Sequence, residues 1–137
     1  MLNMRIQHKG GVLFEAETRG HRVLSDQPAG NGGTDQGMTP PELLLASLGT
    51  CAGYYAVEYL KARSLPAEGL NIQVSAEKAT QPARLGSFLI DVSMPGLEQR
   101  HVEGLNRAVK ACLIHNTLLH PPKIDTVVRS AALTIAA

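Results

Sequence analysis

Short apolar runs alternate with turn residues over the first 26 positions. Three stretches of strand composition, residues 4–9, 12–18 and 21–26, are separated by Gly10-Gly11 and by Arg19-Gly20, which are typical hairpin turn signals. They predict three short antiparallel strands. Residues 28–38 contain four glycines and no apolar run, so we expect a mobile surface loop of the kind that forms lids.

A helix is predicted from the segment that follows. Thr39 offers an N-cap hydroxyl, Pro40 suits the first helical position, and Glu42 stands where a capping box places its acid. The helix should run to about Arg63, before Pro66. Because residues 43–57 are uncharged and have almost no polar face, we expect burial on most sides, which one small domain rarely provides.

The rest of the chain predicts a second hairpin, a second helix and a last strand. Residues 70–76 and, in part, 85–94 alternate around the turn at 79–83. Helical apolar spacing from residue 97 to about 118 includes Cys112 and stops at Pro121-Pro122. Residues 124–136 read as a strand. The order βββ, α, ββ, α, β indicates an α+β fold in a single domain, residues 1–137.

Composition and charge limit which binding partners and which cellular compartment we expect for the protein. Thirteen Lys and Arg against twelve Asp and Glu give a net charge of +1 with no basic run, so we expect no nucleic acid partner. The first residues lack the apolar core of a signal peptide. The uncharged stretch 43–57 is shorter than the roughly 20 residues that span a bilayer. We therefore expect a cytoplasmic protein with no membrane partner.

The two cysteines, Cys51 and Cys112, are the candidate chemistry. In a reducing compartment they are better candidates for reactive thiols than for a structural disulfide. Side-by-side packing of their helices would bring the sulfurs within bonding reach, although buried cysteines are also common as small apolar fillers. Gly49 and Gly53 flank Cys51 on one helix face, each costing about 1 kcal/mol of helix propensity. They predict the close approach of another helix.

Three charged residues are candidates for supporting the chemistry of Cys51: Glu42, Arg19 and Arg22. Glu42 lies about 13 Å along a straight helix from Cys51 and half a turn away, so it is either a cap or serves a thiol of another chain. Arg19 and Arg22 are the only arginines between the first strand and the Cys51 helix. An arginine beside Cys51 would favour its thiolate, while solvated strand-edge positions are the alternative for both.

Histidines leave a further alternative open. His115 follows Cys112 by three residues, and His120 is close behind. A metal site formed by these histidines with the two cysteines is conceivable, but the chain has neither a CxxC pair nor an HExxH signature. A hydrogen-bonding role for His115 near the helix end fits the pattern better.

The stretch "TPPELLLASLGTC", the second cysteine in "AVKACLIHNTL" and the element order together resemble the OsmC/Ohr family, the osmotically induced and organic hydroperoxide resistance proteins. The resemblance covers nearly the whole chain. It implies an intertwined homodimer in which antiparallel sheets wrap two long central helices, one per subunit. An active site is then expected at each end of the interface.

The resemblance also implies roles for individual residues. Cys51 matches the peroxidatic cysteine, Cys112 the resolving one, and Glu42 the glutamate that holds a catalytic arginine. In the OsmC branch that arginine lies shortly before the PEL motif, where residues 28–38 have none, so Arg19 or, by its place inside the third strand, Arg22 would substitute, as in the Ohr branch.

We therefore expect a cofactor-free thiol peroxidase for organic hydroperoxides, reset by a dithiol reductant such as a lipoylated protein. Two other functions fit the same residues. One is a module that binds a small hydrophobic molecule, with incidental cysteines. The other is a thiol-exchange or hydrolytic enzyme that uses Cys51 with His115.

Overall fold

The computed structural model describes residues 1–130 and begins with a small antiparallel sheet. Strands β1 (Arg5–His8), β2 (Phe14–Thr18) and β3 (His21–Ser25) pair in the order β1-β2-β3. Arg19 and Gly20 join β2 to β3 with φ of 51° and 82°, the left-handed geometry of a two-residue hairpin turn. The predicted opening of three strands is confirmed.

The loop after this sheet is tied to a buried carboxylate. Asp26 is 2% exposed and accepts hydrogen bonds from the backbone N–H groups of Gln27 at 2.8 Å, Thr34 at 3.3 Å and Gln36 at 3.0 Å. These bonds, that of Gln36 foremost, lower the pKa of Asp26. The segment between them forms the 3₁₀ turn η1 (Ala29–Asn31). The loop predicted to be a mobile lid thus has a defined internal scaffold.

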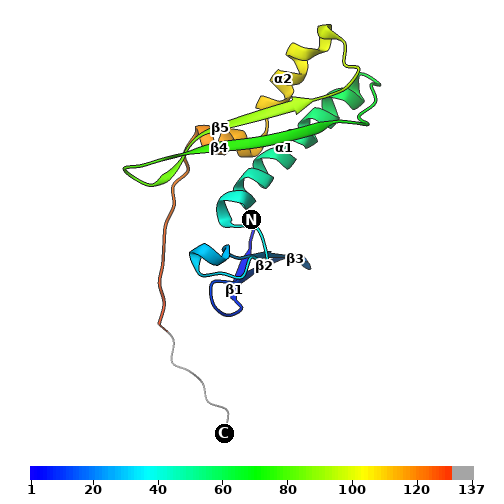
Figure 1. The fold of residues 1–137 in the computed structure, drawn as a ribbon. Coiled ribbons are helices and arrows are strands. Elements are labelled where there is room, and N and C mark those ends of the chain that lie inside the picture. The colour runs from blue at the N-terminus through cyan, green and yellow to red at the C-terminus, as the bar shows by residue number, and fades with distance from the viewer. Residues whose placement is uncertain (131–137) are drawn as a thin grey trace.

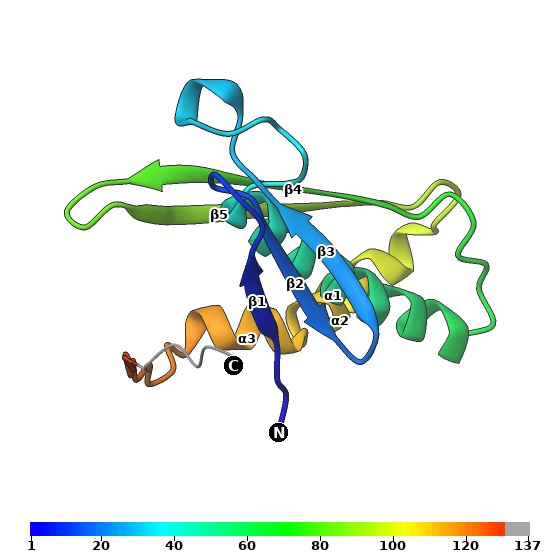
Figure 2. The ribbon, with the colours of Figure 1, turned by 90° about the horizontal axis from the view of Figure 1, so that it is seen from below.

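Helix α1 (Pro40–Ala62) follows, and a long hairpin of β4 (Asn71–Ala79) and β5 (Arg84–Ser93) lies along it (Figure 1). The hairpin pairs from Asn71 opposite Ser93 to Ala79 opposite Arg84, and its residues alternate between exposed and half-buried. Both the helix and the second hairpin were predicted from the sequence. Figures 1 and 2 show the β1–β3 sheet near the start of α1, separate from this hairpin.

Two glycines of α1 allow β4 to lie close to the helix. A Cβ atom at Gly49 would stand 2.9 Å from Val74 Cγ2, and one at Gly53 would stand 3.2 Å from Ile72 Cδ1. The close approach predicted from this pair therefore exists. Its partner is a strand, because the hairpin occupies the face of α1 that the glycines share.

The second predicted helix, over residues 97–118, is wrong as a single element. The chain instead forms a 3₁₀ turn η2 (Gln99–His101), helix α2 (Val102–Lys110) and helix α3 (Leu113–Leu119). Cys112 breaks the run with an extended backbone, φ −57° and ψ 134°. Apolar residues keep helical spacing across this break, so the pattern does not show it. Within residues 1–130 the chain thus has one long α-helix, α1, and two short ones, α2 and α3.

The last predicted strand, over residues 124–136, is wrong for the residues that the structure describes. Residues 124–130 have no strand structure, and the remaining positions lie outside the described residues. Ile124, Val127 and Val128 are 82%, 68% and 91% exposed, and the segment leaves the body of the molecule (Figure 1). A strand needs a neighbouring backbone to pair with, and this segment has none among residues 1–130.

The core of the single chain is small. One stripe of α1 packs against α2, and the fully buried apolar residues are Leu48, Ala52, Ala56, Leu60, Leu105, Val109 and Cys112. The single chain does not bury α1 on most sides, because Tyr54 is 62% exposed and Val57 37%. Burial of α1 by a second subunit stays a prediction. Among the described residues, no helix combines the length and apolar character that a membrane crossing requires.

Candidate active site

The start of α1 is fixed by a reciprocal cap between Thr39 and Glu42. The Thr39 backbone N–H and hydroxyl donate to Glu42 Oε1 at 3.0 and 2.7 Å, and the Glu42 N–H donates to Thr39 Oγ1 at 3.5 Å. The bonds from the backbone and side chain of Thr39 lower the pKa of Glu42. Glu42 is therefore the capping acid within its own chain. A role for Glu42 in the active site of another chain, near that chain's thiol, stays a prediction.

Helices α1 and α3 bring the two cysteines together. Cys51 stands on α1 and is half-buried, whereas Cys112 is fully buried at the start of α3, and both are free thiols. Contacts between α1 and α3 bring the Cys112 thiol near Cys51, close enough for each to affect the ionisation of the other. Cys112 Sγ also caps α3, because it accepts a hydrogen bond from the backbone N–H of His115 at 3.4 Å. The break in the predicted second helix thus places its cysteine beside the first.

The surroundings give the two thiols opposite tendencies to ionise. Burial raises the pKa of Cys51, but hydrogen bonds from the Cys112 thiol and from the backbone N–H groups of Ile114 and Leu113 outweigh it and leave the pKa lowered. Burial, the hydrogen bond to Cys51 and the negative charge on Cys51 raise the pKa of Cys112. The arrangement favours a thiolate on Cys51 and a protonated thiol on Cys112.

Neither predicted arginine contributes to the ionisation of Cys51 within the described part of the chain. Arg22 lies on β3, where its Nε is 3.7 Å from Glu15 Oε1 and 3.6 Å from Glu17 Oε2. Arg19 occupies the β2–β3 turn. Their role beside Cys51 stays a prediction. The groups that sequence reasoning missed are the N–H groups at the start of α3, because an uninterrupted helix would have concealed them.

His115 lies on α3, one helical turn after Cys112. Its Nδ1 atom is buried and has no hydrogen-bond partner among residues 1–130. The side chain lines a cavity of about 840 Å³ between β5 and the helices α2 and α3. His120, in contrast, caps the end of α3, where its Nδ1 lies 3.0 Å from the Asn116 carbonyl oxygen.

A metal centre has no support in the described residues. No three His, Cys, Asp or Glu side chains gather there in a way that would hold a metal ion. The set considered from the sequence, two cysteines with His115 and His120, is divided between the thiol pair, the cavity wall and the end of α3.

Comparisons with known proteins agree with this fold. The sequence pattern of OsmC-like proteins matches residues 33–127, which include both cysteines and the α1 cap. The chain therefore belongs to the OsmC family. No curated protein sequence matches it.

Solved structures show the same fold at low sequence identity. A protein from Psychrobacter arcticus, named for osmotic stress induction and a detoxification response, is 18% identical with a TM-score of 0.78, over 85% of this chain and 88% of the other. An OsmC-like protein from Mycoplasma pneumoniae is 20% identical with a TM-score of 0.67, over 88% and 89%. An organic hydroperoxide resistance protein from Legionella pneumophila is 18% identical with a TM-score of 0.60, over 86% and 90%.

Proposed function

We propose that this protein is a thiol-dependent peroxidase that reduces organic hydroperoxides. The observation that supports this best is the unequal thiol pair. Cys51 and Cys112 are 61 positions apart in the sequence, yet they come together where α1 contacts α3, and their surroundings lower the pKa of Cys51 and raise that of Cys112. The names of structural neighbours, including organic hydroperoxide resistance proteins, point to the same substrate class.

In the proposed reaction, the Cys51 thiolate attacks the terminal oxygen of the hydroperoxide. The O–O bond breaks, Cys51 becomes a sulfenic acid, and the departing alkoxide takes a proton to become an alcohol. Cys112 then attacks the sulfenic sulfur. The S–O bond breaks, a Cys51–Cys112 disulfide forms, and the hydroxyl leaves as water with the Cys112 proton.

A dithiol reductant completes the proposed cycle by thiol–disulfide exchange. One thiolate of the reductant attacks the disulfide, which releases one cysteine and forms a mixed disulfide with the other. The second thiol of the reductant then breaks the mixed disulfide, which releases the second cysteine and leaves the reductant as a disulfide. A lipoylated protein is our preferred candidate. We expect the enzyme in the cytoplasm, where free thiols are maintained.

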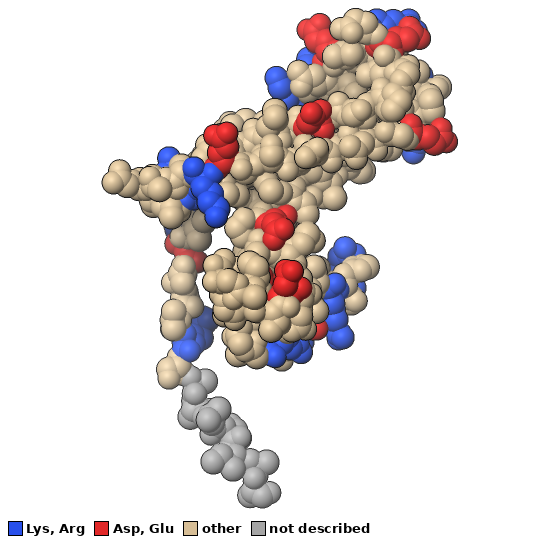
Figure 3. Space-filling view, in the orientation of Figure 1, with Lys and Arg blue, Asp and Glu red and all other residues tan. Residues whose placement is uncertain are grey.

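We further propose that the active form is an intertwined homodimer. The chain exposes 10753 Å², whereas a compact monomer of its 14.6 kDa would expose about 6,900 Å². The excess is about 3,800 Å². This area is larger than the surface that each subunit buries in many obligate homodimer interfaces. Figure 3 shows charges of both signs scattered over one face, with uncharged surface between them. Two copies of α1 wrapped by both sheets would cover the apolar side chains that one chain exposes.

The test is a hydroperoxide consumption assay. Cumene hydroperoxide and hydrogen peroxide are compared, with dithiothreitol or dihydrolipoamide as reductant. We expect faster turnover of cumene hydroperoxide, abolished in Cys51→Ser. Cys112→Ser should complete one oxidation and then accumulate sulfinic acid, detected by mass spectrometry.

Other results would favour other functions. If neither peroxide is consumed, the cavity of about 840 Å³ makes a binding module for a small hydrophobic molecule the better proposal. If thiol exchange or ester cleavage occurs without peroxide consumption, a different cysteine enzyme is favoured. Equal, unimpaired peroxide turnover in both cysteine variants would remove the thiol pair from the mechanism.

A further inference from the structure

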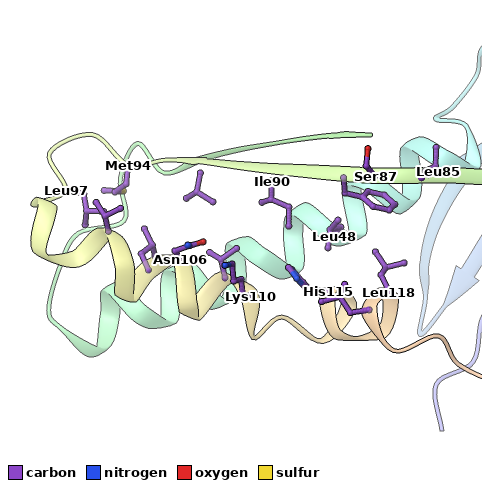
Figure 4. Close-up of a pocket in the computed structure, with 17 residues that line it drawn as sticks. Leu48, Leu85, Ser87, Ile90, Met94, Leu97, Asn106, Lys110, His115 and Leu118 are labelled. Atoms are coloured by element: carbon purple, nitrogen blue, oxygen red, sulfur yellow. The ribbon is translucent and has the colours of Figure 1, made fainter. Parts of the chain in front are cut away.

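The cavity between β5 and the two short helices has one apolar wall and one partly polar wall. The strand side is formed by large apolar side chains, among them Phe88, Ile90 and Val92. Along the helical side stand three polar side chains, Asn106, Lys110 and His115, which Figure 4 shows in a row. A molecule that fits both walls is apolar on one side and carries a hydrogen-bonding group on the other.

His115 is the polar group that most clearly lacks a partner. Its Nδ1 is buried and makes no hydrogen bond among residues 1–130, and buried polar atoms in folded proteins are rarely left unpaired. Figure 4 shows its ring reaching from α3 into the cavity, near Leu48. A hydroxyl or carbonyl group of a molecule in the cavity would satisfy this nitrogen.

The same residue connects the cavity to the thiols. The His115 backbone N–H donates to Cys112 Sγ at 3.4 Å, while its side chain lines the cavity. Neither cysteine lines the cavity, but His115 follows Cys112 by one turn of α3, and Leu48, which also lines the cavity, precedes Cys51 by one turn of α1. This position suits the organic part of a hydroperoxide better than it suits hydrogen peroxide, which has no organic part to hold.

We infer that the cavity receives the organic part of the hydroperoxide and that His115 selects organic parts with a hydroxyl or carbonyl group of their own. This inference rests on the proposed peroxidase function and adds a specificity residue to it. The apolar body lies against β5, the added polar group meets His115 Nδ1, and the hydroperoxy end is directed towards Cys51.

The experiment compares cumene hydroperoxide with its para-hydroxymethyl derivative, which adds one hydroxyl. Wild type should favour the derivative by about tenfold in kcat/KM, mainly through a lower KM, since this is the upper range for one neutral hydrogen bond. His115→Phe keeps a ring and the backbone N–H on Cys112 but should lose this preference. His115→Asn retains a hydrogen-bonding atom near the position of Nδ1 and should recover part of it.

His120→Phe is the matched control, because this histidine caps the end of α3 and is not among the residues that line the cavity. Its preference for the derivative should equal that of wild type. If wild type consumes both hydroperoxides but shows no preference, or if His115→Phe slows both equally, the specificity role is refuted and the peroxidase function is retained.

Measuring ligand binding to the Cys51→Ser variant tests the inference independently of peroxide turnover. The probes are 4-isopropylbenzyl alcohol and 4-isopropyltoluene, which differ by the hydroxyl. We expect about tenfold tighter binding of the alcohol and a change in the His115 imidazole ¹⁵N resonance, assigned by its absence in His115→Phe. Equal binding with an unchanged resonance would overturn the inference, including the case in which a second subunit already bonds to Nδ1.

Discussion

Gly49→Ala and Gly53→Ala make a matched test of how tightly the Cys51 turn of α1 is packed. Each substitution should gain about 1 kcal/mol of helix propensity. At Gly49 the new methyl would stand 2.9 Å from Val74 Cγ2. Valine is stiff at χ1 and its methyl cannot retreat without moving β4, so an overpacking cost of about 1–3 kcal/mol applies. The net change should be a destabilisation of about 1 kcal/mol.

At Gly53 the new methyl would stand 3.2 Å from Ile72 Cδ1, the free end of a longer side chain that can rotate away. We expect Gly53→Ala to be neutral or stabilised by up to about 1 kcal/mol. The two variants should therefore differ by about 1–2 kcal/mol in free energy of unfolding.

Urea unfolding followed by circular dichroism measures this difference, at one fixed subunit concentration because assembly shifts apparent stability. Gly30→Ala is the control, since a Cβ at Gly30 meets nothing within 4 Å. If both helix variants have the same stability, or if Gly49→Ala is the more stable, the close packing of β4 on α1 is refuted.

Two further predictions follow from the thiol pair and the exposed surface. Iodoacetamide labelling of Cys51 should rise with pH at a lower midpoint than labelling of Cys112, because hydrogen bonds lower the pKa of Cys51 and burial raises that of Cys112; the same midpoint for both, by mass spectrometry, would contradict the assigned roles. Light scattering at micromolar concentration should give twice 14.6 kDa, because one chain leaves so much apolar surface exposed; a single monomer peak would rule out the homodimer.

Local signals predicted most of the fold. The capping box at Thr39 and Glu42, the hairpin turn at Arg19-Gly20 and the alternation of β4 each depend on residues within a few positions of one another. Such features are set by local backbone chemistry, which a sequence displays directly. The order of the elements up to β5 followed from them and, with the sequence motifs around the two cysteines, supported the resemblance to the family that the comparison confirmed.

The wrong predictions concern elements whose structure depends on contacts between residues far apart in the sequence. The start of α3 depends on Cys112, whose thiol lies near Cys51 of another helix. The apolar spacing of residues 97–118 carries no sign of that contact and therefore predicted a single helix. Residues 124–130 have strand-like composition, but a strand exists only beside a pairing edge. Arg22 forms ion pairs with Glu15 and Glu17 on the neighbouring strand, and its role beside Cys51 stays a prediction.

The helix break at Cys112 also bears on how the proposed enzyme would be recycled. In the reduced protein, N–H groups of Leu113 and Ile114 stabilise the Cys51 thiolate, and these bonds weaken once the sulfur is tied up in a disulfide. Stabilising the reduced form makes a disulfide more oxidising and easier for a dithiol to reduce. In the proposed cycle, the backbone groups that prepare Cys51 to attack a peroxide would therefore also favour its release after each turnover.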